Sequence, residues 1–154
     1  MTSFPLRDAA DDDAPALAAL FRRASLANPG DRAALLGHPH ALAWTGPPPP
    51  PARCRVATDG AGGPPVGFAT TTPAPGSDGA VELVDLFVEP HRWRRGVARL
   101  LVADAVGAAR DSGTSRVEVD ANPHARDFYE AVGFVVVGET STEFGPGLRM
   151  HLQV

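Results

Sequence analysis

VEPHRWRRGVARLL is the sequence of residues 88–101, and the interpretation of the whole chain starts from it. The preceding residues, 81–88, form an apolar run typical of a β-strand, and the residues after Gly96 have the apolar spacing of a helix. The loop between them is basic and contains a glycine. A helix N-terminus carries unpaired N–H groups and a partial positive charge, so it favours anions. The segment therefore predicts a strand–loop–helix unit that binds a diphosphate.

The side chains of this loop suit such a ligand. Gly96 and Ala98 are small enough for a ligand to approach the backbone closely. Guanidinium groups match phosphate geometry, and four are available, at Arg92, Arg94, Arg95 and Arg99. Neither the G-x-x-x-x-G-K-[ST] nor the G-x-G-x-x-G motif occurs in the chain, which argues against a P-loop and a dinucleotide fingerprint. The alternative interpretation of the loop is a helix start with a solvated basic face.

Composition limits the classes of function. The chain has 154 residues and a net charge of −4, and its 14 basic residues are all arginine. This size predicts one domain, residues 1–154, and the negative charge argues against general nucleic-acid binding. The single cysteine, Cys54, allows no intrachain disulfide and no cysteine-based metal site, and we expect it in the core. No signal peptide or membrane-spanning run is apparent, so we expect a cytoplasmic protein that binds neither metal nor membrane.

The order of elements follows from periodicity and from turn residues. Turn clusters separate three short β-type runs, which predicts an antiparallel meander. A strand, a helix and a second strand then follow, which predicts a parallel right-handed crossover. Asn122 and Pro123 predict a helix N-terminus, and Gly133 predicts its end. We expect strands at 4–7, 53–58, 66–72, 81–88, 116–120, 134–137 and 148–152, and helices at 12–26, from 31 onward, at 94–112 and from 123 to 132.

Two sequence blocks together resemble the GNAT N-acetyltransferase superfamily. The first is LFVEP at 86–90 with RRGVARLL at 94–101, which resembles the family's acetyl-CoA diphosphate loop, [QR]-x-x-G-x-[GA]. The second is NPHARDFYEAVGF at 122–134, which matches every lettered position of N-x-x-A-x-x-F-Y-x-x-x-G-F. The order of elements is also similar to that family over essentially the whole chain. One position departs from the pattern, because Trp93 stands where the family has Gln or Arg.

The resemblance implies a fold, a cofactor and an activity. The fold would be of the α/β (α+β) type, with a central mixed, mostly antiparallel sheet of six to seven strands and helices on both faces. The activity would be transfer of an acetyl group from acetyl-CoA to a primary amine by direct attack. The residues that would contact acetyl-CoA are Phe87, Val88, Arg94, Arg95, Gly96, Val97, Ala98, Arg99, Asn122 and Tyr129. The acceptor amine is not identified, and the oligomeric state is left open, with a homodimer as one option.

The chemistry implied by the resemblance needs particular residues. A backbone N–H near Phe87 or Val88 would polarise the thioester carbonyl, while the pantetheine arm lies between the splayed strands at 81–88 and 116–120. Glu82 or Asp85 would accept the proton of the amine. Tyr129 would protonate the departing thiolate, and because neighbouring helix residues point about 100° apart, we expect Phe128 to pack inward instead. The alternatives are a non-catalytic acyl-CoA sensor or a protein-interaction module of the same fold, and an enzyme that uses another acyl donor.

Overall fold

The computed structural model of the chain describes residues 3–76, 79–142 and 145–154. Within these residues, seven strands form one sheet with the order β1-β2-β3-β4-β5-β7-β6. The strands are β1 (Leu6–Asp8), β2 (Arg53–Thr58), β3 (Pro65–Pro73), β4 (Ala80–Val88), β5 (Arg116–Ala121), β6 (Val135–Thr142) and β7 (Gly145–Gln153). The α-helices are α1 (Ala14–Leu26), α2 (Pro29–Leu36), α3 (Val97–Asp111) and α4 (Arg126–Ala131). This is the predicted mixed, mostly antiparallel α+β arrangement.

Contacts divide the chain into two compact units, which we describe separately. The first unit comprises Met1–Thr70 and Asp85–Leu101, and the second comprises Thr71–Val84 and Val102–Val154. The strands β3 and β4 and the helix α3 each contribute residues to both units. The single-domain prediction stays a prediction.

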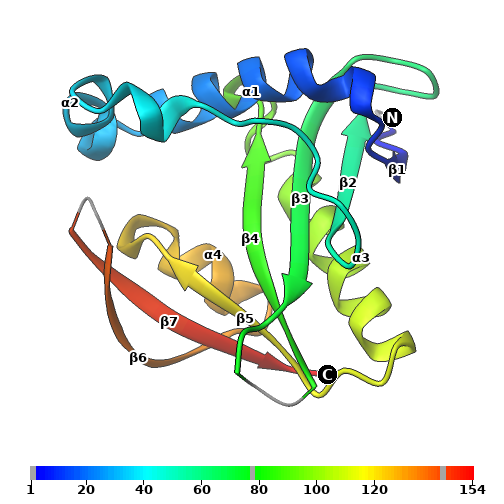
Figure 1. Ribbon diagram of the computed structural model, residues 1–154, viewed down its shortest axis with the longest axis vertical. Coiled ribbons are helices and arrows are strands. Elements are labelled where there is room, and N and C mark those ends of the chain that lie inside the picture. Colours follow the sequence, from blue (N-terminus) through cyan, green and yellow to red (C-terminus); the bar gives the residue numbers. More distant parts are fainter. Residues whose placement is uncertain (1–2, 77–78, 143–144) are drawn as a thin grey trace. The chain divides into compact units, whose positions relative to one another are not determined.

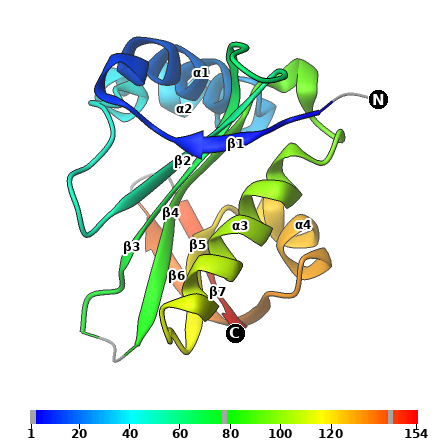
Figure 2. The same cartoon turned by 90° about the vertical axis from the view of Figure 1, so that its right-hand side faces the viewer.

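The first unit contains the meander and the N-terminal helices. The arrows of β2, β3 and β4 alternate in direction in Figure 1, as predicted for this segment. Figure 2 shows α1 and α2 next to each other. The apolar stripe of α1 is fully or almost fully buried at Leu17, Leu20 and Ala24, and it packs in one cluster with Phe68. Cys54 belongs to the same cluster, so its predicted place in the core is confirmed.

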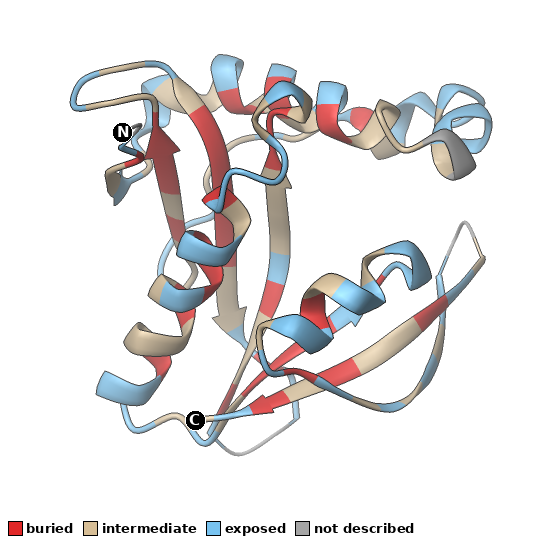
Figure 3. Ribbon diagram, turned by 180° about the vertical axis from the view of Figure 1, so that it is seen from behind, coloured by how far each residue is buried: buried red, intermediate tan, exposed pale blue. Residues whose placement is uncertain are grey.

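The second unit is built on β5, β6 and β7. β7 pairs antiparallel with both β5 and β6, and buried positions recur along β7 among partly exposed ones (Figure 3). β4 pairs in parallel with β5, which confirms the predicted parallel connection between the strands that flank α3. That ladder joins Ala80–Glu82 to Arg116–Glu118, while β4 continues for six more residues. Among the described residues, no helix combines the length and the apolar character needed to cross a bilayer.

Several predicted boundaries differ from the structure by a few residues, and two of these differences have a physical explanation. α3 begins at Val97 rather than at residue 94, because Arg94 (φ 64°) and Gly96 (φ 87°) adopt left-handed conformations that a right-handed helix cannot include. β6 extends to Thr142, whereas the sequence predicted an end at residue 137. β6 lies at the edge of the sheet, where a strand can carry polar residues. Its second half is polar and therefore lacks the apolar pattern by which a strand is recognised in a sequence.

Gly67 on β3 sets how closely α3 approaches the sheet. A Cβ atom at this position would lie 2.9 Å from Cγ1 of Val97, 3.1 Å from the carbonyl oxygen of Phe87 and 3.3 Å from Cδ1 of Leu101. Val97 and Leu101 lie in the first turns of α3 and are each 1% exposed. The absence of a side chain at Gly67 therefore lets the start of α3 pack directly on β3.

We expect Gly67→Ala to lower the free energy of unfolding by about 1–3 kcal/mol, because overpacking displaces α3 or strains β4. Gly107→Ala in α3 is the matched control, since a Cβ there meets nothing within 4 Å. The control should raise stability by about 0.5–1 kcal/mol through helix propensity. Urea unfolding measures both variants. A Gly67→Ala protein as stable as the control would show that the space above Gly67 can adapt.

Candidate functional site

The loop between β4 and α3 has an unusual backbone. Arg94 and Gly96 both have positive φ, and they are separated by one residue. Arg94 is the only non-glycine residue with positive φ in the described part of the chain, and such a conformation is uncommon outside glycine. Alternation of left-handed and right-handed residues turns successive N–H groups toward one concavity, which binds anions. The conformation supports the predicted anion site.

The helix that follows this loop adds to the candidate anion site. The N–H of Leu100 donates to the carbonyl of Gly96 (3.0 Å), so Gly96 caps the N-terminus of α3. A Cβ atom at Gly96 would have nothing within 4 Å, and the side chains of Arg94, Arg95 and Arg99 are exposed. Gly96 thus leaves room at the helix N-terminus, and three exposed guanidinium groups lie close to it in sequence.

The root of the loop is held by a residue that the sequence did not single out. Glu89 is 5% exposed, and its two carboxylate oxygens accept hydrogen bonds from the guanidinium of Arg23 on α1, with Nε–Oε1 at 2.7 Å. The carboxylate of Glu89 raises the pKa of Arg23. The N–H of Glu89 donates to Val66 on β3 (2.8 Å), and its carbonyl accepts from Arg92 (2.8 Å). An acidic residue beside arginines gives no sequence signal that it will be buried.

Two other loop side chains are also anchored. The indole N–H of Trp93 donates to the carbonyl of Val88 at 2.9 Å. Arg92, which the sequence counted among the ligand-binding arginines, instead forms an ion pair with Asp59 (Nη2–Oδ2, 2.6 Å). The neutralised guanidinium of Arg92 therefore contributes less to the positive charge of the loop than Arg94, Arg95 and Arg99 do.

Asp85 is a partly buried carboxylate in the same unit. Its Oδ2 accepts a hydrogen bond from Trp44 Nε1 at 3.3 Å, and burial raises the pKa of Asp85 above its ordinary value. Phe87, two residues further along β4, packs against Phe21 and Phe68 with ring centroids 4.6 and 5.7 Å away. Asp85 and Phe87 thus lie on the face of β4 that carries the aromatic core, as strict alternation predicts.

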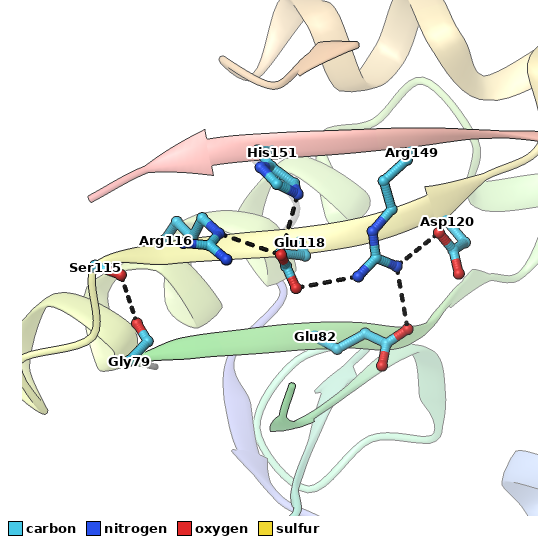
Figure 4. A network of polar contacts seen from close by, with 8 residues as sticks. All are labelled: Gly79, Glu82, Ser115, Arg116, Glu118, Asp120, Arg149 and His151. Atoms are coloured by element: carbon cyan, nitrogen blue, oxygen red, sulfur yellow. Dashed lines mark hydrogen bonds and ion pairs between the residues drawn. The ribbon is translucent and has the colours of Figure 1, made fainter. Parts of the chain in front are cut away.

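The other predicted base, Glu82, lies in the second unit within a charged network that Figure 4 shows. Glu82 is the ladder partner of Glu118 on β5, and two carboxylates at that spacing repel each other. Arg149 of β7 lies between them, with Nη1 3.8 Å from Glu82 Oε1 and Nη2 3.1 Å from Glu118 Oε2. Nη1 also bonds Asp120 at 2.7 Å. The hydrogen bond to Asp120 contributes most to the raised pKa of Arg149.

Glu118 is the buried centre of that network. It is 4% exposed, and besides Arg149 its carboxylate contacts Arg116 Nε (3.2 Å) and His151 Nε2 (3.0 Å). The sequence singled out neither Glu118 nor its partners. The polar positions along strand 116–120 predicted only which side chains share a face. The pairing itself depends on β7, which is distant in sequence but adjacent in the sheet.

Asn122 and the helix after it confirm one prediction and contradict another. Oδ1 of Asn122 accepts the N–H of His124 (2.9 Å), so the predicted cap is present, on a short 3-10 turn before α4. The prediction that Phe128 packs inward instead of Tyr129 is wrong. Tyr129 is 7% exposed and Phe128 is partly exposed. The ring of Tyr129 packs edge-on against Phe134 (5.4 Å between centroids), which the chain reversal at Gly133 brings beneath it.

Burial has a chemical consequence for Tyr129, because it raises the pKa of the phenol to about 12. The folded protein therefore keeps this hydroxyl protonated at neutral pH, as a proton donor must be. The folded-state pKa lies above the ordinary value near 10. The stabilisation linked to the neutral phenol is thus complete below about pH 10 and is lost as the pH rises through about 12.

We expect the folded protein to show no phenolate absorbance until about pH 12 or until it unfolds. Tyr129 is the only tyrosine, so ultraviolet absorbance reports it without overlap from other tyrosines. The same chain unfolded in urea is the control and should titrate near pH 10. Reversible titration near pH 10 in the folded protein would contradict the buried position of the hydroxyl.

Comparison with known proteins agrees with this arrangement. A sequence model of the acetyltransferase (GNAT) family matches residues 19–134. No curated protein sequence matches the chain. Similar solved structures include a GCN5-related N-acetyltransferase from Rhodopseudomonas palustris, with TM-score 0.75 and 23% identity over 100% of this chain and 98% of that one.

Two further structures are similar over nearly their full length. A GCN5-related N-acetyltransferase from Kribbella flavida has TM-score 0.72 and 25% identity, covering 99% of this chain and 98% of that one. The PaiA N-acetyltransferase from Thermoplasma acidophilum, solved in complex with coenzyme A, has TM-score 0.71 and 14% identity, covering 99% of each chain. These likenesses establish a shared fold.

Proposed function

We propose that this chain, which belongs to the acetyltransferase (GNAT) family, transfers the acetyl group of acetyl-CoA to a primary amine by direct attack. The observation that carries the proposal is the left-handed conformation of Arg94 and Gly96 directly before α3. Backbone N–H groups in such a loop and at a helix N-terminus bind a diphosphate, which is the anionic centre of coenzyme A. Support for the cofactor also comes from the solved relative that holds coenzyme A.

The proposed contacts to acetyl-CoA keep the residues predicted from the sequence. The backbone of Arg94, Arg95, Gly96, Val97 and Ala98 would bind the diphosphate, with Arg99 adding positive charge. These contacts are made by backbone N–H groups and do not depend on which side chains the loop carries. Trp93 in place of Gln or Arg therefore leaves this binding mode intact. Asn122 and Tyr129 are proposed as further contacts to the cofactor.

The direction of the β4 backbone favours Val88 over Phe87 as the donor to the thioester carbonyl. The N–H of Glu89 bonds Val66 on β3, and backbone groups alternate in direction along a strand. The groups of Phe87 therefore point toward β3 as well, and those of Val88 and Leu86 point away from it. The N–H of Val88 is thus directed to the edge of β4 that faces away from β3, where it can polarise a carbonyl oxygen.

The proposed reaction balances as a simple acyl transfer. The amine nitrogen attacks the thioester carbon, the carbon–nitrogen bond forms and the carbon–sulfur bond breaks. A carboxylate takes the proton that the amine loses, and Tyr129 gives a proton to the departing thiolate. The hydroxyl of Tyr129 carries its proton at neutral pH, which the second role requires.

Asp85 and Glu82 remain the two candidates for the base. The raised pKa of Asp85 favours it, since a general base works best when its pKa lies near the operating pH. Glu82 instead shares the guanidinium of Arg149 with Glu118 and Asp120. A carboxylate engaged in a charged network is less available to a substrate proton, so we propose Asp85 first and Glu82 second.

We expect free coenzyme A to be released when the protein, acetyl-CoA and a panel of primary amines are combined. Gly96→Glu should abolish release and weaken acetyl-CoA binding measured by calorimetry, because it strains the loop (φ 87°) and repels the diphosphate. Gly107→Glu is the matched control, as it adds the same charge further along α3 at a position where a Cβ atom would meet nothing within 4 Å. Unchanged acetyl-CoA affinity in folded Gly96→Glu would exclude the loop as the diphosphate site.

A non-catalytic acyl-CoA sensor is the second candidate function. It predicts acetyl-CoA binding that depends on Gly96, with no release of coenzyme A for any amine. The same experiment therefore separates the sensor from the enzyme.

We expect Asp85→Asn to lower kcat by about 10²–10⁴-fold and to remove the acid limb of the pH profile. Burial disfavours the ionised Asp85, so the variant should match or exceed wild-type stability at about pH 8 and lose that advantage as the pH falls through the raised pKa. Glu82→Gln is the comparison variant, and thermal unfolding at several pH values accompanies the kinetics. A kcat loss in Glu82→Gln alone would reverse the assignment.

A further inference from the structure

We infer that Trp93 is a cofactor-binding residue whose indole packs along the pantetheine arm of acetyl-CoA. The inference rests on the proposed function and assigns a role to the one residue of the loop that departs from the family pattern. Its basis is the direction of the β4 backbone, the hydrogen bond of the indole and the exposure of the ring. All of these features lie within the first unit.

The indole lies on the edge of β4 that faces away from β3. The N–H of Glu89 donates to Val66 of β3, so the backbone groups of the preceding residue, Val88, point the opposite way. Trp93 Nε1 donates to that carbonyl of Val88 at 2.9 Å. The bond places the ring beside the same edge to which the N–H of Val88 is directed.

The exposed part of the ring is carbon. Trp93 is 46% exposed, and the only polar atom of an indole is the N–H that bonds Val88. The exposed carbons of the indole form an apolar surface that the apolar groups of a ligand can cover. The tether to Val88 also fixes the orientation of the ring, so a ligand would lose little entropy by ordering it.

The pantetheine arm has the chemistry that this surface would bind. The arm alternates amide groups with methylene and methyl groups. One of its amide N–H groups can donate to the carbonyl of Val88, because a carbonyl oxygen has two lone pairs and Trp93 uses one of them. Its apolar carbons can cover the indole. In coenzyme A the arm joins the diphosphate directly, and Trp93 likewise directly precedes the left-handed residue Arg94. The adenine lies on the other side of the diphosphate.

Calorimetry with three ligands and two variants tests this assignment. Coenzyme A has the arm, the diphosphate and the nucleoside; 4′-phosphopantetheine has the arm and one phosphate; ADP has the nucleoside and the diphosphate but no arm. Removing roughly 50 Å² of ring contact in Trp93→Ala should weaken binding of the two arm-containing ligands by about 5- to 20-fold and leave ADP unchanged. Trp93→Phe keeps a flat apolar ring without the N–H, and should restore affinity to within about threefold of wild type.

Other outcomes overturn the inference. An equal loss for all three ligands would make Trp93 only an anchor of the loop. A loss confined to ADP and coenzyme A would assign the ring to the adenine. A gain in affinity on removing the ring would mean that the indole competes with the arm for Val88. A wild-type protein that binds none of the ligands would instead refute the proposed function, and circular dichroism of each variant confirms that it is folded.

Discussion

The carboxylate of Glu89 is buried where β4 ends, and its pairing with Arg23 is the interaction on which the candidate site depends. A carboxylate that is 5% exposed and unpaired would cost several kcal/mol of solvation free energy. The guanidinium of Arg23 is about half exposed, so only one partner of the pair loses most of its water. Glu89 connects three elements: it lies at the end of β4, its carboxylate binds Arg23 of α1, and its N–H donates to Val66 of β3.

Because Glu89 is held in place, the loop that follows it can keep the unfavourable left-handed conformation of Arg94. A left-handed arginine costs roughly 1–2 kcal/mol, and the conformation persists only if both ends of the loop are held. Glu89 and the Trp93–Val88 hydrogen bond hold one end. At the other end, Val97 is 1% exposed and packs above Gly67. The strain is concentrated where a ligand would use the exposed N–H groups, which is common at functional sites.

Charge is arranged differently in the second unit. Glu82, Glu118 and Asp120 lie on neighbouring strands, and Arg149 reaches all three. The negative charge of the buried Glu118 needs the guanidinium of Arg149 close by. Only an alignment of β4, β5 and β7 that keeps Arg149 next to Glu118 meets this need, so the network favours that alignment. Tyr129 differs from these carboxylates, because burial is what raises the pKa of its phenol. Asp85 is intermediate, with burial opposed by the hydrogen bond from Trp44.

The sequence by itself determined the features that depend on residues close to one another along the chain. Apolar periodicity predicted α1, turn residues predicted the meander, and Asn122 with Pro123 predicted the helix cap. The loop of small residues and arginines before α3 predicted an anion site, which stays a prediction. The tertiary structure decided which polar groups are buried and by what they are balanced. Glu89 with Arg23, and Glu118 with Arg149, are 66 and 31 residues apart in sequence. It also decided that Tyr129 rather than Phe128 faces inward. Local propensity depends on neighbours along the chain, whereas burial and ion pairing depend on residues that only the folded sheet brings together.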